Sequence, residues 1–216
     1  MTARLRSLSR AKEGEFSLLV NLNGKRLILA SGSPRRSQLL KLIGLDFEVI
    51  DSKVNERDEE YTIPEVHVLE LAQKKAQKVA ENITDGIIIG ADTIVVLDNE
   101  ILGKPDSATA AQKMLRQLSG QTHRVYTGFA LIERPSGTIL SDYEQTQVTF
   151  REIADDEIAH YVATESPLDK AGAYGIQDQS AVFVSRIDGC FYNVMGFPLA
   201  KFYWRLQSFL KSNDLK

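Results

Sequence analysis

Apolar runs of strand length recur along the first half of this chain, separated by stretches with helical spacing. Runs at residues 27–30, 47–50 and 86–97 have the length and the Val, Ile and Leu content of buried strands. Asp92 interrupts the third run, which predicts either one long or bent strand or two strands with a break at residues 90–92. In both cases an acid lies inside an apolar, strand-like segment.

Helices are predicted where apolar residues recur every three or four positions behind a start signal. Proline suits the first helical turn, and Asp or Ser caps the helix end through its side chain. The predicted starts are Pro34, Pro64, Asp106 or Ser107, Asp155 and Pro198. Helices that alternate with strands in this way are typical of α/β proteins.

The second half of the chain is richer in strands and tight turns. Strands at residues 124–133 and 138–150 flank a turn at 135–137, and strands at 181–187 and 190–195 flank Asp188-Gly189, a strong hairpin signal. The pattern therefore predicts a mixed α/β fold, with helices packed on a sheet that includes antiparallel hairpins.

Composition and charge narrow the class of protein. The chain has 216 residues, of which 43% are hydrophobic, and 26 Lys and Arg against 29 Asp and Glu give a net charge of -3. That balance excludes a generally basic nucleic-acid-coating protein but allows a local phosphate site. Cys190 is the one cysteine, so no internal disulfide is possible. We expect a cytoplasmic globular protein with no nucleic-acid or membrane partner.

Residues 1–24 differ in composition from the rest of the chain. They carry four basic residues among serines, with no acid before Glu13. An organelle transit peptide has this composition, and a non-native or mis-started extension would look the same. Residues 1–24 are therefore predicted to lie outside the fold, and the ordered domain is predicted to span residues 25–212.

A turn suited to anions lies between the first strand and the first helix, with the sequence SGSPRR at residues 31–36. Backbone N–H groups at a helix start favour an anion, and Gly32 lets a ligand approach the backbone. Arg35 and Arg36 add planar donors suited to phosphate. An ordinary capped helix with solvated arginines would have the same pattern.

Asp92 is a second candidate for chemistry. A carboxylate inside an apolar strand is costly to bury unless it is paired, hydrogen-bonded or metal-bound. At a strand end it would point into a crevice where α/β proteins bind ligands, and the alternative is a solvated acid at a strand break. Lys75, Lys104 and Glu56 are further candidates, although each one alone is typical of a surface residue.

A loop of small residues, DKAGAYGIQ at 169–177, could wrap a ligand, and Gln177 could read a base edge. A plain surface turn is the alternative. His67, His123 and His160 lie far apart in the sequence without zinc-type spacing, so they are assigned no role.

Taken together, these motifs resemble one known family. In order, the chain carries LASGSPRR (29–36), LAQKKA (71–76), GADT (90–93), GKP (103–105), LSGQTH (118–123), DKAGAYGIQ (169–177) and VMGFPL (194–199). Each motif is weak alone, but seven in order make a chance match implausible. From about Lys25 to about Leu210 the sequence closely resembles the Maf family of nucleoside triphosphate pyrophosphatases, on the branch that acts on dTTP and UTP.

The resemblance implies a fold, an activity and a cofactor. The fold is an elongated α/β fold with a mixed sheet, flanking helices and two lobes around a central cleft, often in a homodimer. The activity is hydrolysis between the α and β phosphates of dTTP and UTP, modified pyrimidine nucleotides included, to the nucleoside monophosphate and pyrophosphate. The cofactor is a divalent metal cation, magnesium or manganese. Residues 25–212 would then be a Maf-like nucleotide pyrophosphatase domain.

The resemblance also assigns roles to residues of this sequence. The catalytic acid falls on Asp92, and the substrate-binding residues fall on Ser31, Arg36, Lys75 and Lys104. The metal ligands fall on Glu56 and Asp92, and the specificity positions fall on Arg35, Thr93 and Gln177. Whether Asp92 holds the metal or takes a proton from water stays open.

The chain departs from the family's pattern at two places: residues 1–24 precede the family's usual start, and Asp178 replaces a common glycine. Asp178 stands where a glycine commonly follows Gly-Ile-Gln, which could change the loop's flexibility or the base preference. Two alternative functions stay open. The chain could be a nucleotide-binding regulatory protein without turnover, or a pyrophosphatase whose substrate is a purine nucleotide or a modified nucleotide. An acid close to phosphate-binding lysines favours an enzyme.

Overall fold

The structure is a computed structural model that describes residues 22, 24–55 and 63–213. Its helices are α1 (Pro34–Leu42), α2 (Pro64–Ala80), α3 (Ala108–Leu118), α4 (Asp155–Val162), α5 (Phe191–Val194) and α6 (Leu199–Asn213). Its strands are β1 (Leu27–Leu29), β2 (Glu48–Val49), β3 (Gly86–Leu97), β4 (Glu100–Leu102), β5 (Thr122–Arg134), β6 (Ile139–Phe150) and β7 (Val184–Asp188). Three 3₁₀ turns are η1 (Ser166–Asp169), η2 (Ala171–Ala173) and η3 (Gln179–Phe183).

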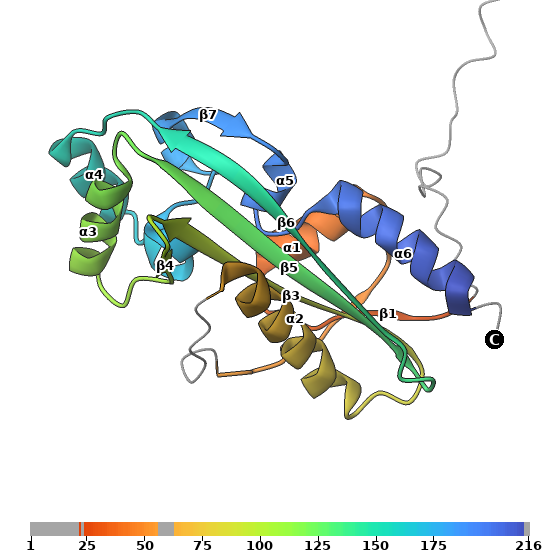
Figure 1. The fold of residues 1–216 in the computed structure, drawn as a ribbon. Helices are drawn as coiled ribbons and strands as arrows, with labels where there is room; N and C mark the ends of the chain where they lie inside the picture. Colours follow the sequence, from red (N-terminus) through yellow and green to blue (C-terminus); the bar gives the residue numbers. More distant parts are fainter. Residues whose placement is uncertain (1–21, 23, 56–62, 214–216) are drawn as a thin grey trace, which may run out of the picture.

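The described strands form one seven-stranded mixed sheet in the order β2-β1-β3-β5-β6-β7, with β4 also paired to β3. β1 runs parallel to β2 and β3, whereas β3, β5, β6 and β7 are antiparallel neighbours. In Figure 1 the long strands β3, β5 and β6 run through the length of an elongated molecule. The predicted mixed α/β fold with flanking helices is confirmed.

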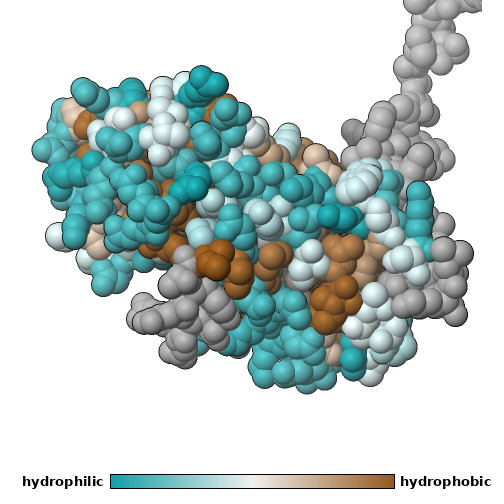
Figure 2. Space-filling model, viewed as in Figure 1, coloured by the Kyte–Doolittle hydropathy of each residue, from teal (hydrophilic) through white to brown (hydrophobic). Residues whose placement is uncertain are grey.

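Helices cover both faces of this sheet. The alanines of α2, Ala72 and Ala76, pack with Ile88 on one face, while Phe202 of α6 packs with Phe129 on the other. Because a Cβ on Gly90 of β3 would come within 2.1 Å of the Ala72 carbonyl oxygen, only glycine lets α2 lie this close to the strand. Figure 2 shows one side of the molecule as mainly hydrophilic, with a band of apolar atoms near its middle.

Most predicted elements are present. Residues 86–97 form one continuous strand rather than two. Ser107, rather than Asp106, caps α3, because its Oγ accepts from the Ala110 N–H at 3.2 Å. Asp98 and Asn99, both at positive φ, form a turn that leads into β4, a strand that the sequence pattern did not reveal.

The predicted hairpin around Asp188-Gly189 is wrong. Its first half forms η3 and β7, but its second half turns into the short helix α5. Asn193 explains the difference, because its buried amide donates to the Val125 carbonyl and to Thr146 Oγ1, each at 3.0 Å. These bonds draw the segment onto the sheet, so local turn preference is overridden by tertiary contacts.

The predicted boundary of the fold lies mostly outside the described residues, which include only Leu22 and Gly24 of residues 1–24. Leu22 is partly buried and packs against the core that contains Leu27 and Phe202. The domain limits therefore stay predictions. Among the described residues, no helix is long and apolar enough to cross a membrane.

Candidate active site

A cavity opens where the edge of β3 changes partners. β1 pairs with residues 87–89 of β3 and β4 pairs with residues 95–97. Between them, within the described chain, this edge has no strand partner, and a cavity of about 690 Å³ lies there. A second cavity of about 370 Å³ shares several lining residues with the first and adjoins it. Ligands of α/β proteins commonly bind at such a switch in sheet topology.

The structure brings together every predicted site residue that it describes. The larger cavity is lined by Arg35, Arg36, Lys75, Asp92, Thr93, Lys104 and Gln177, and the smaller one by Ser31 together with four of these. The predicted metal ligand Glu56 lies outside the described residues. Segments up to 146 positions apart in sequence (residues 31 and 177) thus meet at one site.

Arg36 fixes the turn after β1 against the rest of the site. Its guanidinium donates to the Ala91 carbonyl at 2.8 Å, to Thr93 Oγ1 at 3.1 Å, to the Gly196 carbonyl at 3.1 Å and to Ser31 Oγ at 3.2 Å. A planar donor group with several acceptors has little freedom left. Arg36 therefore holds a positive charge at a fixed place in the cavity wall.

Asp92 has the partner that burial requires. Lys75 Nζ on α2 donates to Asp92 Oδ1 at 2.7 Å, and both residues are only 5% exposed. The second carboxylate oxygen, Oδ2, lies 3.9 Å from Nε2 of His67. The buried acid is thus compensated by a lysine 17 positions earlier in the chain, at the wall of the larger cavity.

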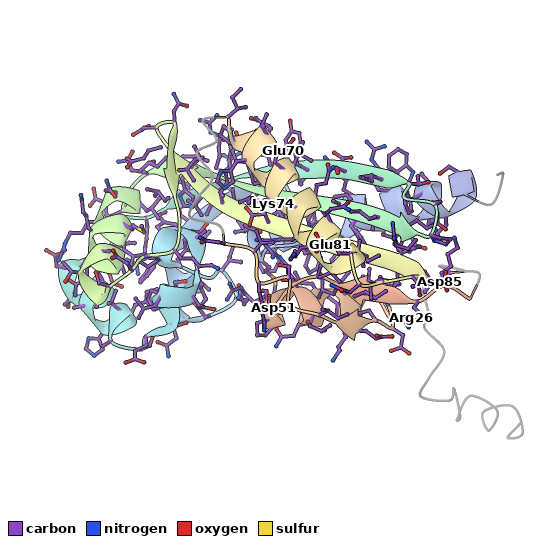
Figure 3. All side chains as sticks on the ribbon, turned by 90° about the horizontal axis from the view of Figure 1, so that it is seen from below. Arg26, Asp51, Glu70, Lys74, Glu81 and Asp85 are labelled. Atoms are coloured by element: carbon purple, nitrogen blue, oxygen red, sulfur yellow. The ribbon has the colours of Figure 1, made fainter. Side chains whose placement is uncertain are left out.

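His67 is a site residue that sequence reasoning missed. His67, Leu71 and Lys75 lie four positions apart on α2, and all three line the larger cavity. That spacing places them on one face of the helix. The eight-position separation of His67 and Lys75 in the sequence was therefore a signal that could have identified His67 as a site residue. Figure 3 shows the exposed Glu70 and Lys74 along the same helix, viewed from outside.

Thr93 has its hydroxyl engaged within the protein. Thr93 Oγ1 accepts from Arg36 and lies 3.0 Å from Thr127 Oγ1, which donates to the Asn193 carbonyl at 3.1 Å. Thr127 and Asn193 are fully buried and were not predicted. Their role is visible only after β3, β5 and α5 have packed together. Thr93 therefore helps to hold the Arg36 guanidinium in place.

Arg35, Lys104 and Gln177 lie at the rim of the larger cavity. Lys104 and Gln177 are exposed, and Arg35 Nη1 donates to Asp169 Oδ2 at 2.8 Å. Burial alone would raise the pKa of Asp169, but hydrogen bonds from Lys170 and Arg35 outweigh it and lower that pKa below its ordinary value. The rim therefore combines an arginine held by Asp169, an exposed lysine and a polar amide.

One part of the larger cavity's wall, at Tyr174, is uncharged. Tyr174 lines the larger cavity, and its hydroxyl lies 2.8 Å from Nε2 of His123. Burial lowers the pKa of His123 to about 4 and raises the pKa of Tyr174. Both rings are therefore neutral near pH 7, and Tyr174, in contact with the buried His123 behind it, gives this part of the cavity an aromatic surface.

The donor set fits a cation that arrives with phosphate better than a resident one. Within the described chain, no group of three or more His, Cys, Asp or Glu could hold a metal ion. Asp92 supplies one carboxylate, with Oδ1 already bound by Lys75. Magnesium is often held by one or two carboxylates together with substrate phosphates, so Asp92 can serve as one such ligand, and Glu56 as the second stays a prediction.

Comparison with known proteins places these residues in a family context. Residues 26–209 match the family described as Maf-like protein. A Bacillus cereus protein (strain ATCC 10987 / NRS 248) named dTTP/UTP pyrophosphatase is 47% identical over 198 residues, which is 92% of this chain and 93% of the relative. A Bacillus cytotoxicus protein of the same name is 49% identical over 185 residues, covering 86% and 96%.

Among solved structures, the Staphylococcus aureus Ham1 protein aligns with 88% of this chain and all of its own, with a TM-score of 0.47 and 18% identity. The sequence comparisons are far stronger, because they combine nearly half identity with coverage of most of both chains. With the family match across residues 26–209 and the predicted motif residues gathered around one cavity, the chain belongs to the Maf family.

Proposed function

We propose that this chain is a nucleoside triphosphate pyrophosphatase that hydrolyses dTTP and UTP to the nucleoside monophosphate and pyrophosphate. The close relatives named dTTP/UTP pyrophosphatase support the reaction. The observation that carries it is the charge of the smaller cavity. Of its fourteen lining residues, five are basic and two are acidic, in a chain whose net charge is -3. A triphosphate is the ligand that such a local excess suits.

The two adjoining cavities divide the substrate between them. Arg36, Lys75 and Lys104 serve both cavities and bind the phosphates at their junction. The larger cavity adds apolar side chains such as Val95 and Val125 for the base. The residues of α1 and α2 on one side of these cavities and of the η1–η2 segment on the other support the central cleft that the Maf-like fold implies.

Gln177 reads the base and α1 receives the phosphates. A glutamine amide offers both donors and an acceptor, which match the carbonyl and N–H groups of a pyrimidine edge. Ser33 begins α1 without a side-chain capping bond of its own. The positive end of this helix borders the smaller cavity, where it attracts phosphate oxygens.

Asp92 acts as general base in the chemical step. It takes a proton from the water that attacks the α-phosphorus, while the bond from that phosphorus to the bridging oxygen breaks and pyrophosphate leaves. Lys75 holds Asp92 Oδ1 and so fixes the plane of the carboxylate. Arg36 and Lys104 balance the charge that collects on the leaving pyrophosphate. A divalent cation, when bound with the triphosphate, would neutralise further phosphate charge.

Product analysis tests this function. The full chain is incubated with dTTP, UTP, GTP and ATP in magnesium, and nucleoside monophosphate, diphosphate, phosphate and pyrophosphate are quantified. We expect monophosphate and pyrophosphate in equal amounts, fastest from dTTP and UTP. Release of phosphate with diphosphate would contradict cleavage at the α–β bond, and tight binding without any product would favour the regulatory alternative.

A further inference from the structure

A row of alternating charges connects α1 to the loop that carries Gln177. Arg35 donates to Asp169 twice, from Nη1 to Oδ2 at 2.8 Å and from Nη2 to the carbonyl oxygen at 3.3 Å. Lys170 Nζ donates to Asp169 Oδ1 at 2.8 Å and lies 3.5 Å from Asp178 Oδ2. Asp178 directly follows Gln177. These contacts therefore connect Arg35 to the residue beside Gln177, so that two of the three predicted specificity residues are joined by one continuous set of contacts.

Asp178 anchors the Gln177 end of this row. It accepts hydrogen bonds from the Tyr161 hydroxyl at 3.2 Å, from Ser166 Oγ at 3.1 Å, and from the N–H and Oγ of Ser180 at 2.9 and 2.8 Å. A residue bound by that many donors fixes the backbone on either side of it. The position at which the family commonly has glycine thus carries the anchor of the loop in this chain.

The loop is also packed tightly against the lysine of the row. Lys170 is only 8% exposed, and a Cβ on Gly175 would come within 2.7 Å of Lys170 Cε and within 2.8 Å of Asp178 Oδ2. Glycine at 175 lets the backbone pass between these two side chains. Gln177 therefore extends from a segment whose backbone has little room to move.

The Arg35–Asp169 contact at one end of this row contributes little to folding stability. The Arg35 and Asp169 side chains are 24% and 63% exposed, and exposed ion pairs add little to folding stability. Two bonds from one planar guanidinium, to the carboxylate and to the backbone carbonyl of Asp169, do fix its orientation. The contact thus orients Arg35 at the rim, where Arg35, Asp169 and Lys170 all line the larger cavity.

We propose that Asp169, Lys170 and Asp178 are positioning residues that set the base preference by holding Arg35 and Gln177 in place. The proposal rests on the proposed function and extends it, because it assigns the preference for pyrimidines to side chains that need not contact the base. Asp169 acts through Arg35, and Asp178 acts through the backbone of Gln177. Lys170 couples the two carboxylates.

The experiment compares Asp169→Ala, Arg35→Ala and the double variant in the full chain. KM and kcat are measured for dTTP and GTP, together with the melting temperature. We expect Asp169→Ala to lower the dTTP-to-GTP ratio of kcat/KM about tenfold, mainly through KM for dTTP, because one charge-assisted contact is lost. The melting temperature should stay unchanged, and the double variant should be no worse than Arg35→Ala alone.

Two further variants sharpen the test. Asp155→Ala breaks the Arg116–Asp155 pair, which is also exposed and lies outside both cavities, so it should leave the ratio unchanged. Asp178→Asn should lower the ratio as Asp169→Ala does, through Gln177. The proposal is overturned if Asp169→Ala keeps the wild-type ratio, or if the losses from Arg35 and Asp169 simply add.

Failure of the proposed function would be distinguishable. If the wild-type chain binds dTTP but releases no pyrophosphate, the pyrophosphatase assignment fails, and the same variants are then ranked by their calorimetric affinity for dTTP against GTP. The affinity ratio must fall in Asp169→Ala for the proposal to stand. A wild-type chain that binds neither nucleotide would reject both.

Discussion

Replacing Asp92 by asparagine tests both the chemistry of this site and its stability. The substitution keeps the shape of the side chain but removes the charge that faces Lys75 Nζ at 2.7 Å. Two losses are expected, because Asp92 is both the proposed general base and one half of a buried ion pair. Each loss has its own measurement.

The magnitude follows from the burial of the pair. Asp92 and Lys75 are each 5% exposed, and breaking such a pair by removing one partner costs about 3–5 kcal/mol. The asparagine oxygen can still accept from Lys75, so we expect the lower end, about 3 kcal/mol. In a domain of this size, that corresponds to a fall in melting temperature of roughly 6–12 °C. Turnover should fall at least about 100-fold.

A second variant tells these two effects apart. In Asp92→Asn/Lys75→Met both charges are gone and an apolar side chain of similar length fills the site of Lys75, so most of the melting temperature should return. Turnover should not return, because the base is still absent and the proposed phosphate contact of Lys75 is lost as well. The assay measures UTP hydrolysis at 25 °C and thermal melting on the same preparations, with the exposed Asp155→Asn as the control.

Two results would refute this reasoning. If Asp92→Asn melts like the wild type and hydrolyses UTP at a similar rate, Asp92 contributes neither to the buried pair nor to the chemistry. If the double variant regains turnover along with stability, the loss in the single variant came from unfolding, and Asp92 is a structural acid.

Three further predictions concern acid, phosphate and the N-terminus. Burial lowers the pKa of His123 to about 4, below its unfolded value of about 6.5, so the unfolded chain binds more protons than the folded chain between these pH values. The free energy of unfolding should therefore fall as the pH drops from about 6.5 towards 4, by up to about 3 kcal/mol. His123→Gln should flatten this part of a plot of melting temperature against pH, the exposed His160→Gln should not, and equal slopes in all three proteins would exclude His123 as the cause. Lys104→Ala should lower kcat/KM about 10- to 100-fold with an unchanged melting temperature. Arg36→Ala should lower both kcat/KM and the melting temperature, because Arg36 also bonds the Ala91 and Gly196 carbonyls. Wild-type kinetics in either variant would assign that residue to structure or surface alone. Deleting residues 1–21, which keeps Leu22 against the core, should leave melting temperature and turnover nearly unchanged, and a large loss in either would show that the segment belongs to the fold.

The helices and most of the strands could be read from the sequence because their signals are local. Pro34 and Pro64 stand at the first turns of α1 and α2, and Ser107 caps α3, as the backbone preferences of these residues require. It was also predictable that Asp92 needs a partner, because burying an uncompensated charge in an apolar strand costs a large free energy. The remaining site residues were predicted from the resemblance of their motifs to those of the Maf family.

What the sequence could not determine depends on which distant segments meet. Lys75 as the partner of Asp92, and His67 beside it, follow from α2 resting directly on Gly90. The wrong hairpin after Asp188 has the same origin, because the bonds of Asn193 to the sheet outweigh a local turn signal. Local patterns report what a segment prefers in isolation, whereas the partner of a buried charge is chosen by the long-range packing that removes water from around it.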